Sequence, residues 1–261
     1  MQSKKLLKIA SWNVNSLKVR LEHVQQWMKN SAVDLLALQE TKLTDADFPE
    51  QAFLDLGLHV VFSGQKTYNG VAVISREPIS CIETEIPGFI DPQRRVLAVT
   101  SHGIRLINLY VPNGSEVGSD KYIYKLSWLQ HVTEYINRQL SLYPQLVVLG
   151  DFNIAPKDCD VYSPTAMQGG ILISQCERDA FSELLSLGLE DGFRMLNPGL
   201  NRYSWWDYRA ASFKRNLGAR IDHILPSKQL HERIVASDVD LEPRCWERPS
   251  DHAPIWMTLN L

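Results

Sequence analysis

Short apolar runs that end in polar residues recur along this chain, and they constrain its fold more than any other feature. Residues 147–149 lead through Gly150 into Asp151 and Asn153. On an extended chain, a carboxylate and an amide two positions apart project from the same face. The pattern predicts a buried strand whose end carries two polar groups that can reach one bound ligand.

Similar polar groups flank five other apolar runs. They are Asn13 with Asn15, Gln39 with Glu40, Tyr110 with Asn113, Asp222 with His223, and Asp251 with His252. A single Asp or Asn at a strand end is most often a turn residue. Several such ends, rich in oxygen ligands, instead predict one shared site for metal and phosphate chemistry.

Strand-like runs outnumber helical ones. Helical periodicity is found at residues 21–28, 126–140 and 181–185, the last ending near Gly188. Strand-like runs lie at 60–62, 71–74, 96–100, 105–110, 221–225 and 256–259. Because several strands follow one another closely, we expect mainly antiparallel neighbours. The predicted fold is α+β, with two sheets packed face to face and helices outside.

The length of 261 residues favours one large domain over residues 1–261, with two small domains as the alternative. No linker, low-complexity tract or clear repeat divides the chain. The irregular segment 156–170 is expected to be a surface excursion near the site. No stretch is apolar enough to span a bilayer, so we expect no membrane association.

Charge and cysteine content leave the partner open but favour one compartment. The formal charge of −3 does not exclude DNA, because site carboxylates lower the total while a basic rim can face phosphates. Four widely spaced cysteines favour neither a zinc site nor a disulfide framework. Reduced thiols and a cytoplasmic location are expected. Nothing in the chain demands more than a monomer.

Glu40 is the strongest candidate for a ligand of a hard divalent cation. Carboxylate and amide oxygens suit Mg²⁺ or Mn²⁺, so Asn13 and Asp251 are candidates for the same metal. The alternative is that Glu40 caps a helix introduced by Asp45. A His252 imidazole held by a carboxylate could donate to an anionic oxygen. No Ser or Cys stands in a nucleophile elbow, so water is the expected nucleophile.

The segment 202–220 interleaves cations with aromatic rings. Its members include Arg202, Arg209, Lys214, Arg215, Arg220, Tyr203, Trp205, Trp206, Tyr208 and Phe213. Cations can hold phosphates while flat rings receive an unstacked nucleoside or sugar. The alternative is an aromatic core cluster with solvated cations. We expect Trp205 to form a pocket wall and leave Trp206 and Tyr208 open.

Eight motifs in this order resemble those of the exonuclease III type apurinic/apyrimidinic (AP) endonucleases, from near residue 8 to near residue 260. They are Trp12-Asn13-Val14-Asn15, Leu38-Gln39-Glu40-Thr41-Lys42, Tyr68-Asn69-Gly70-Val71-Ala72, Tyr110-Val111-Pro112-Asn113-Gly114, Gly150-Asp151-Phe152-Asn153, Trp206-Asp207-Tyr208-Arg209, Arg220-Ile221-Asp222 and Ser250-Asp251-His252-Ala253-Pro254. Each motif alone is modest, but the ordered set is specific.

The resemblance implies a four-layer α/β/β/α sandwich of the deoxyribonuclease I type, forming a single endonuclease/exonuclease/phosphatase domain. It implies Mg²⁺-dependent hydrolysis of the DNA phosphodiester 5′ to an abasic site, in base excision repair. Activity as a 3′-5′ exonuclease and 3′-phosphodiesterase is also implied, and the partner is double-stranded DNA with abasic sites or damaged 3′ ends. In this family the segment 165–178 can gate exonuclease against endonuclease activity.

The resemblance also assigns roles by position. It makes Glu40 the main metal ligand with Asn13 and Asp251 close by. Asp151 would orient or deprotonate the attacking water and Asn153 would bind the phosphate. Tyr110 would contact the scissile phosphate, and His252, supported by Asp222, would stabilise its developing charge. The expected substrate contacts are Asn15, Asn113, Trp205, Arg209, Ala219 and Ile221, and Ala219 is smaller than the bulky residues often found there.

Two other functions are compatible with part of this pattern. A phosphoesterase for inositol phosphates or sphingomyelin shares the Asp-Asn and Asp-His pairs, but the segment 202–220 favours DNA. A non-catalytic DNA-binding module would be expected to lose some of the acids, and here none is missing.

Overall fold

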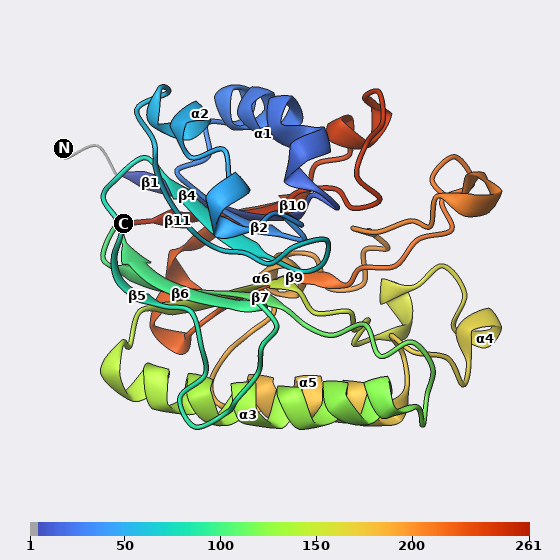
Figure 1. The fold of residues 1–261 in the computed structure, drawn as a ribbon. Coiled ribbons are helices and arrows are strands. Elements are labelled where there is room, and N and C mark those ends of the chain that lie inside the picture. The colour runs from blue at the N-terminus through green and yellow to red at the C-terminus, as the bar shows by residue number, and fades with distance from the viewer. Residues whose placement is uncertain (1–4) are drawn as a thin grey trace.

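Two β-sheets pack face to face, and helices cover the outer face of each (Figure 1). The computed structural model describes residues 5–261, so residues 1–4 of the expected domain lie outside the described range. The predicted α+β fold, a four-layer sandwich of the deoxyribonuclease I type, is confirmed. In Figure 1, α1 and α2 lie on one side of the sheets, and α3 and α5 lie on the other.

The first sheet has six strands and the second has five. The order in the first is β10 (Ile234–Val239), β11 (Ile255–Asn260), β1 (Leu6–Asn13), β2 (Leu35–Gln39), β4 (Val71–Ser75), β3 (His59–Ser63). The order in the second is β5 (Ser80–Glu83), β6 (Val96–Ser101), β7 (Ile104–Tyr110), β8 (Leu146–Asp151), β9 (Asp222–Pro226). The helices are α1 (Leu17–Ser31), α2 (Gln51–Leu54), α3 (Asp120–Leu142), α4 (Pro164–Met167), α5 (Gln175–Ser186) and α6 (Gly192–Leu196).

Parallel pairing occurs where a helix connects neighbouring strands. β1 pairs with β2 across α1, and β7 pairs with β8 across α3. The other strand pairs are antiparallel, as predicted. Because parallel neighbours end at the same edge of a sheet, this topology brings several polar strand ends together.

The predicted helices and strands are present, and two strands escaped prediction. β5 is a mostly exposed edge strand with little apolar content. β10 carries Ser237 and Asp238 and is only partly buried. Neither has the apolar alternation that marks a strand in sequence.

The three long helices α1, α3 and α5 each bury an apolar stripe, and α3 and α5 also begin at a side-chain cap. α1 buries Val24, Trp27 and Met28. α3 begins where the Ser119 side chain accepts from the Tyr122 backbone amide, and α5 begins with a capping box from Ser174. Within residues 5–261, no helix is long and apolar enough to cross a membrane.

Three apolar layers hold the sandwich together. One fills the space between the sheets, one lies between the first sheet and α1, and one lies between the second sheet and α3 with α5. A polar bridge crosses the layer between the sheets. Buried Asn108 on β7 accepts from Gln39 Nε2 over 2.7 Å and donates to the carbonyl oxygens of Leu38 and Ala72 over 2.9 and 3.0 Å. One amide therefore ties β7 to β2 and β4.

Replacing Asn108 with Leu should lower the free energy of unfolding by about 2–4 kcal/mol, because it strands buried polar partners. Urea denaturation measures this as a lower midpoint concentration with an unchanged m-value. Asn137→Leu on the exposed face of α3 is the control and should change little. Equal stability of the two variants would contradict a bridging role for Asn108.

Candidate active site

The polar strand ends meet at one edge of the two sheets. β8 ends at Asp151, and β9 begins opposite it at Asp222. A pocket of about 540 Å³ opens at this edge. The residues that line it and that sequence analysis had singled out are Glu40, Tyr110, Asn113, Asp151, Asn153, Trp205, Ile221, Asp251 and His252.

Asp151 and Asn153 both face the pocket, although the chain between them is not extended as predicted. β8 ends at Asp151, and Asn153 has a left-handed φ of 50°. The Asn153 backbone amide donates to Asp151 Oδ1 over 2.9 Å, which makes a tight turn. The chain needs Gly150 before this turn, because a Cβ there would lie 1.9 Å from the carbonyl oxygen of Leu109.

Glu40 directly follows β2 and is held by two neighbours. Asn13 Nδ2 donates to its Oε1 over 2.8 Å, and Lys42 Nζ lies 2.9 Å from its Oε2. Burial raises the pKa of Glu40, but Lys42 and the Asn13 hydrogen bond outweigh it and lower the pKa below its ordinary value. Glu40 is therefore ionised at neutral pH. The capping alternative is wrong, since Thr44 caps the short helix Asp45–Asp47.

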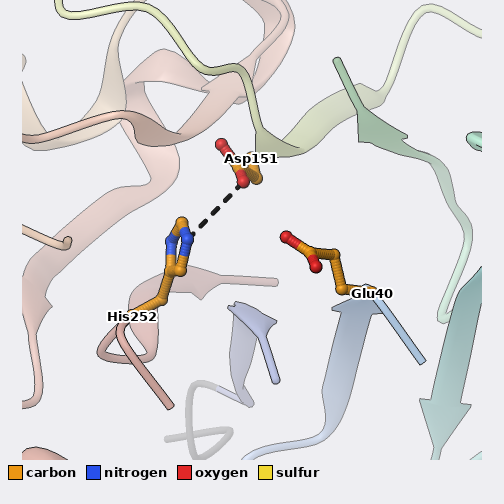
Figure 2. Close-up of side chains that lie close together, drawn as sticks. All are labelled: Glu40, Asp151 and His252. Carbon is orange, nitrogen blue, oxygen red and sulfur yellow. Dashed lines mark ion pairs between the residues drawn. The ribbon is translucent and has the colours of Figure 1, made fainter. Parts of the chain in front are cut away.

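His252 is hydrogen-bonded to one carboxylate and faces a second. Its Nδ1 lies 2.9 Å from Asp222 Oδ2. Its Nε2 lies 3.7 Å from Asp151 Oδ2, the contact drawn in Figure 2. The Ser204 hydroxyl donates to the same Asp222 oxygen over 2.6 Å. Burial lowers the pKa of His252, but Asp222 and Asp151 outweigh it and raise the pKa to about 10. His252 is therefore an imidazolium at neutral pH and can donate from Nε2.

Asp151 is poised to exchange a proton near neutral pH. Burial raises its pKa to about 7, although the charge of His252 opposes the shift. A group with such a pKa is suited to general-base work.

Glu40, Asp151 and His252 form the one group of possible metal ligands found among residues 5–261. Each offers a ligand atom within 4.8 Å of the other two (Figure 2). A protonated imidazole cannot coordinate a metal, so the carboxylates are the better ligands. Carboxylates beside an open pocket, with space for water and phosphate, fit a hard divalent cation.

The two other expected metal ligands, Asn13 and Asp251, are both engaged in hydrogen bonds with protein neighbours around this group. Asn13 Nδ2 bridges the two carboxylates of Figure 2, and its Oδ1 accepts from the Asn15 backbone amide over 3.0 Å. Asp251 accepts from Asn15 Nδ2 over 2.9 Å and from Trp205 Nε1 over 3.0 Å. Asp251 thus lines the pocket outside the clustered ligand atoms, and Asp151 takes the place beside Glu40.

Tyr110 and Asn113 lie at the end of β7. Burial raises the pKa of Tyr110 well above its ordinary value, and the charge of Glu40 adds to the shift. The phenol therefore keeps its proton and can donate. Asn113 Nδ2 donates to Asn153 Oδ1 over 3.1 Å, which joins the two amides at the pocket.

The remaining pocket wall is largely apolar. Trp205 and Ile221 form part of it, as the resemblance implied. Ala219 is fully buried behind them, where its backbone pairs with Trp205, and it does not line the pocket. The rest of this wall comes from Ala166, Met167, Gln168, Gly170, Ile171 and Leu172. The predicted excursion at 156–170 therefore does lie beside the site.

The cations of segment 202–220 do not gather at the pocket. Arg209 is 88% exposed and pairs with Asp207. Arg220 is buried between Asp160 and Asp191, where it is neutralised. Trp206 is 1% exposed within the core, so the structural alternative holds for this residue. The alternation of cations and rings in this segment therefore has several causes: some members form buried ion pairs, some pack in the core, and some are exposed at the surface.

One contributor to the site was missed by sequence analysis, and a second was expected only as a segment. Lys42 was quoted in a motif without a role, although a cation two positions after Glu40 is a signal for an ion pair. The wall residues Ala166 to Leu172 fall in segments that were expected near the site, 156–170 and 165–178, but no local signal singled out the individual side chains.

Comparison with known proteins places this geometry in a family. The model of the Endonuclease/Exonuclease/phosphatase family matches residues 10–252. Exodeoxyribonuclease III of Haemophilus influenzae is 35% identical over 263 residues, covering 96% of this chain and 98% of that protein.

Solved structures agree with the sequence comparison. The 3′ phosphatase NExo from Neisseria, bound to a product DNA hairpin, is 46% identical with a TM-score of 0.97, covering 98% of this chain and 100% of that one. An AP endonuclease from Archaeoglobus fulgidus is 38% identical with a TM-score of 0.95 and the same coverage.

Fold and site together define a hydrolase of the Endonuclease/Exonuclease/phosphatase class. Within that class, the chain belongs to the exonuclease III and AP endonuclease family, whose members act on DNA phosphodiester bonds. The family and enzyme class expected from the motifs are thereby confirmed.

Proposed function

We propose that this chain is a Mg²⁺-dependent DNA repair nuclease of base excision repair, in which residues 1–261 act as one domain and as a monomer. It hydrolyses the phosphodiester 5′ to an abasic site, and it also removes 3′-blocking groups and nucleotides from duplex ends. The observation that carries this proposal is the pocket where Glu40, Asp151 and the Asp222-supported His252 converge. Mn²⁺ can substitute for Mg²⁺, because both prefer oxygen ligands.

Phosphodiester hydrolysis needs an activated water aimed in line, donors to the non-bridging oxygens where charge develops, and stabilisation of the leaving oxygen. Asp151 takes a proton from the attacking water, whose oxygen bonds to phosphorus. His252 donates from Nε2 to a non-bridging oxygen as charge develops on it. The bond from phosphorus to the 3′ oxygen breaks, and that oxygen takes a proton from solvent to become a 3′-hydroxyl, while Asp151 returns its proton to solvent.

Glu40 would hold the cation, with Asn13 donating to its carboxylate and Asp251 lining the same pocket. When bound, the cation supplies Lewis-acid stabilisation of the phosphate and leaving oxygen. Tyr110, Asn153 and Asn113 orient the phosphate through O–H and N–H donors at the pocket floor. Asn15 steadies Asp251, and Arg209 contacts the DNA backbone from the rim.

The apolar wall fits a sugar that has lost its base. Trp205 and Ile221 contribute flat and branched apolar surfaces to the pocket that the carboxylates also line. An abasic nucleotide costs little to unstack, so an apolar wall that receives the bare sugar favours it over a nucleotide that must be unpaired. The relatives support both activities, since one is described as a 3′ phosphatase and another as an AP endonuclease.

One experiment tests the function. Three end-labelled duplexes, with an internal abasic analogue, a 3′-phosphate and a plain 3′ end, are incubated with the protein in Mg²⁺ or in chelator. Incision 5′ to the analogue and trimming of 3′ ends are expected in Mg²⁺ alone. Cleavage confined to the 3′ ends would remove the AP endonuclease assignment, and cleavage of inositol phosphate in preference to DNA would overturn the substrate class.

Glu40→Gln should raise the Mg²⁺ concentration for half-maximal activity by about tenfold or more, because the variant loses a charged ligand. Metal titration of the cleavage rate measures this, and calorimetric Mn²⁺ binding gives a second readout. Glu50→Gln, at an exposed position, is the matched control. An unchanged titration for Glu40→Gln would rule out the ligand role.

A further inference from the structure

A buried ion pair lies beneath the pocket and has no part in the chemistry above. Lys125 on α3 and Glu177 on α5 are in contact, and both side chains are fully enclosed. The two helices lie side by side under the second sheet (Figure 1). Removing two charges from water is costly unless further hydrogen bonds complete the pair.

The Lys125 ammonium completes its contacts on the backbone of the pocket floor. Its Nζ donates to the carbonyl oxygen of Asn153 over 2.7 Å and to that of Asn113 over 3.3 Å. These are the two asparagines whose side chains join at the pocket. Gly114, which has a positive φ, packs so closely on the Lys125 stem that a Cβ would lie 3.2 Å from Cδ. Lys125 therefore fixes two loops at once.

Glu177 completes its contacts on the pocket wall. Its Oε1 accepts from the Leu172 backbone amide over 3.1 Å, and its Oε2 accepts from the Ser174 amide and hydroxyl. Leu172 lines the pocket, and its carbonyl oxygen accepts from the Ala155 amide over 2.7 Å. One ion pair thus links three segments at the pocket, around Asn113, Asn153 and Leu172, that are separated in sequence.

We propose that the Lys125–Glu177 pair is a positioning device that holds the phosphate-orienting asparagines and the Leu172 wall in one arrangement. The inference rests on the proposed function, in which Asn113 and Asn153 orient the scissile phosphate. Neither Lys125 nor Glu177 lines the pocket, so both act through the groups they hold. Small displacements of such groups reduce the rate of the bound complex strongly.

The test compares three variants of the full chain. Lys125→Met keeps the length of the stem and removes the charge, and Lys125→Met/Glu177→Gln also removes the unpaired carboxylate. Arg105→Met is the matched control. The Arg105 side chain is equally enclosed and ion-paired, but it lies at the start of β7, whereas the pocket lies at the other end, at Tyr110. Each variant is assayed for kcat, KM, thermal unfolding and amide hydrogen exchange.

Lys125→Met should lower kcat by about 30-fold with less than about a threefold change in KM, while the Mg²⁺ titration stays unchanged. The double variant should regain stability without regaining kcat. Amide exchange should rise at residues 111–115, 153–155 and 170–174. Arg105→Met should lose stability and keep kcat within about threefold.

Recovery of kcat together with stability in the double variant would show a purely structural pair and overturn the proposal. The proposal would also be overturned if both Lys125 variants failed to fold, or if Lys125→Met lost no more kcat than Arg105→Met. If the unaltered chain cleaves no duplex, the proposed function fails, and the exchange measurement still decides whether the pair holds the three segments.

Discussion

Asp151→Asn should lower kcat on duplex DNA by about 10⁴-fold, the upper end of what general-base catalysis contributes. The amide keeps the size of the carboxylate but cannot take a proton from water. Folding and DNA binding should survive, because burial already raises the pKa of Asp151 to about 7 and a neutral group suits this position. Single-turnover cleavage, filter binding and thermal unfolding measure the three quantities separately.

The pH profile provides the control for this variant. Only ionised Asp151 accepts a proton, so the rate of the unaltered chain should rise about tenfold per pH unit below its pKa and then level off. A cation beside Glu40 favours the ionised carboxylate, so Mg²⁺ should move the midpoint below 7. Asp151→Asn should lose the slope. A variant that retains the slope, or turnover within about tenfold of the unaltered chain, would sink the assignment of Asp151 as base.

The strand ends were predictable because their signal is local. Apolar runs mark buried strands, and polar residues such as Glu40, Asp151 and His252 directly at their ends have few positions to occupy other than the sheet edge. The family resemblance then implied that these strands form two sheets packed face to face. Antiparallel entry of β9 beside β8 places Asp222 opposite Asp151, and His252 hydrogen-bonds to Asp222 there.

Other features depend on tertiary contacts that no local pattern records. The left-handed turn at Asn153 arises because its amide finds the Asp151 carboxylate, and an extended continuation was an equally good local prediction. Lys125 and Glu177 are 52 positions apart, and isolated helical patterns would place both in solvent. Arg220 suggested a phosphate contact until its carboxylate partners Asp160 and Asp191 were seen to enclose it.

The second large effect is expected at the histidine. His252→Asn should lower kcat by about 10³-fold, because one charged donor to the developing negative oxygen is lost. KM should change much less, since the imidazolium acts mainly when that charge appears. Steady-state kinetics on the abasic duplex at pH 7 measures both. A variant whose KM rises while its kcat stays unchanged would contradict this role of His252.

Asp222→Asn tests the same role through pH and keeps the imidazole in place. Asp222 is the largest favourable influence on the His252 pKa of about 10, so its loss should move that pKa toward the ordinary value of 6.5. The imidazolium is present below its pKa and lost above it, so the rate of the variant should peak near pH 7 or just below, where Asp151 is already ionised, and decline as pH rises from 7 to about 9. The unaltered chain should keep its activity across that interval. Parallel alkaline profiles for the two proteins would mean that the charge on His252 does not contribute to the rate, and stabilisation would then rest on Tyr110, Asn153 and the metal site.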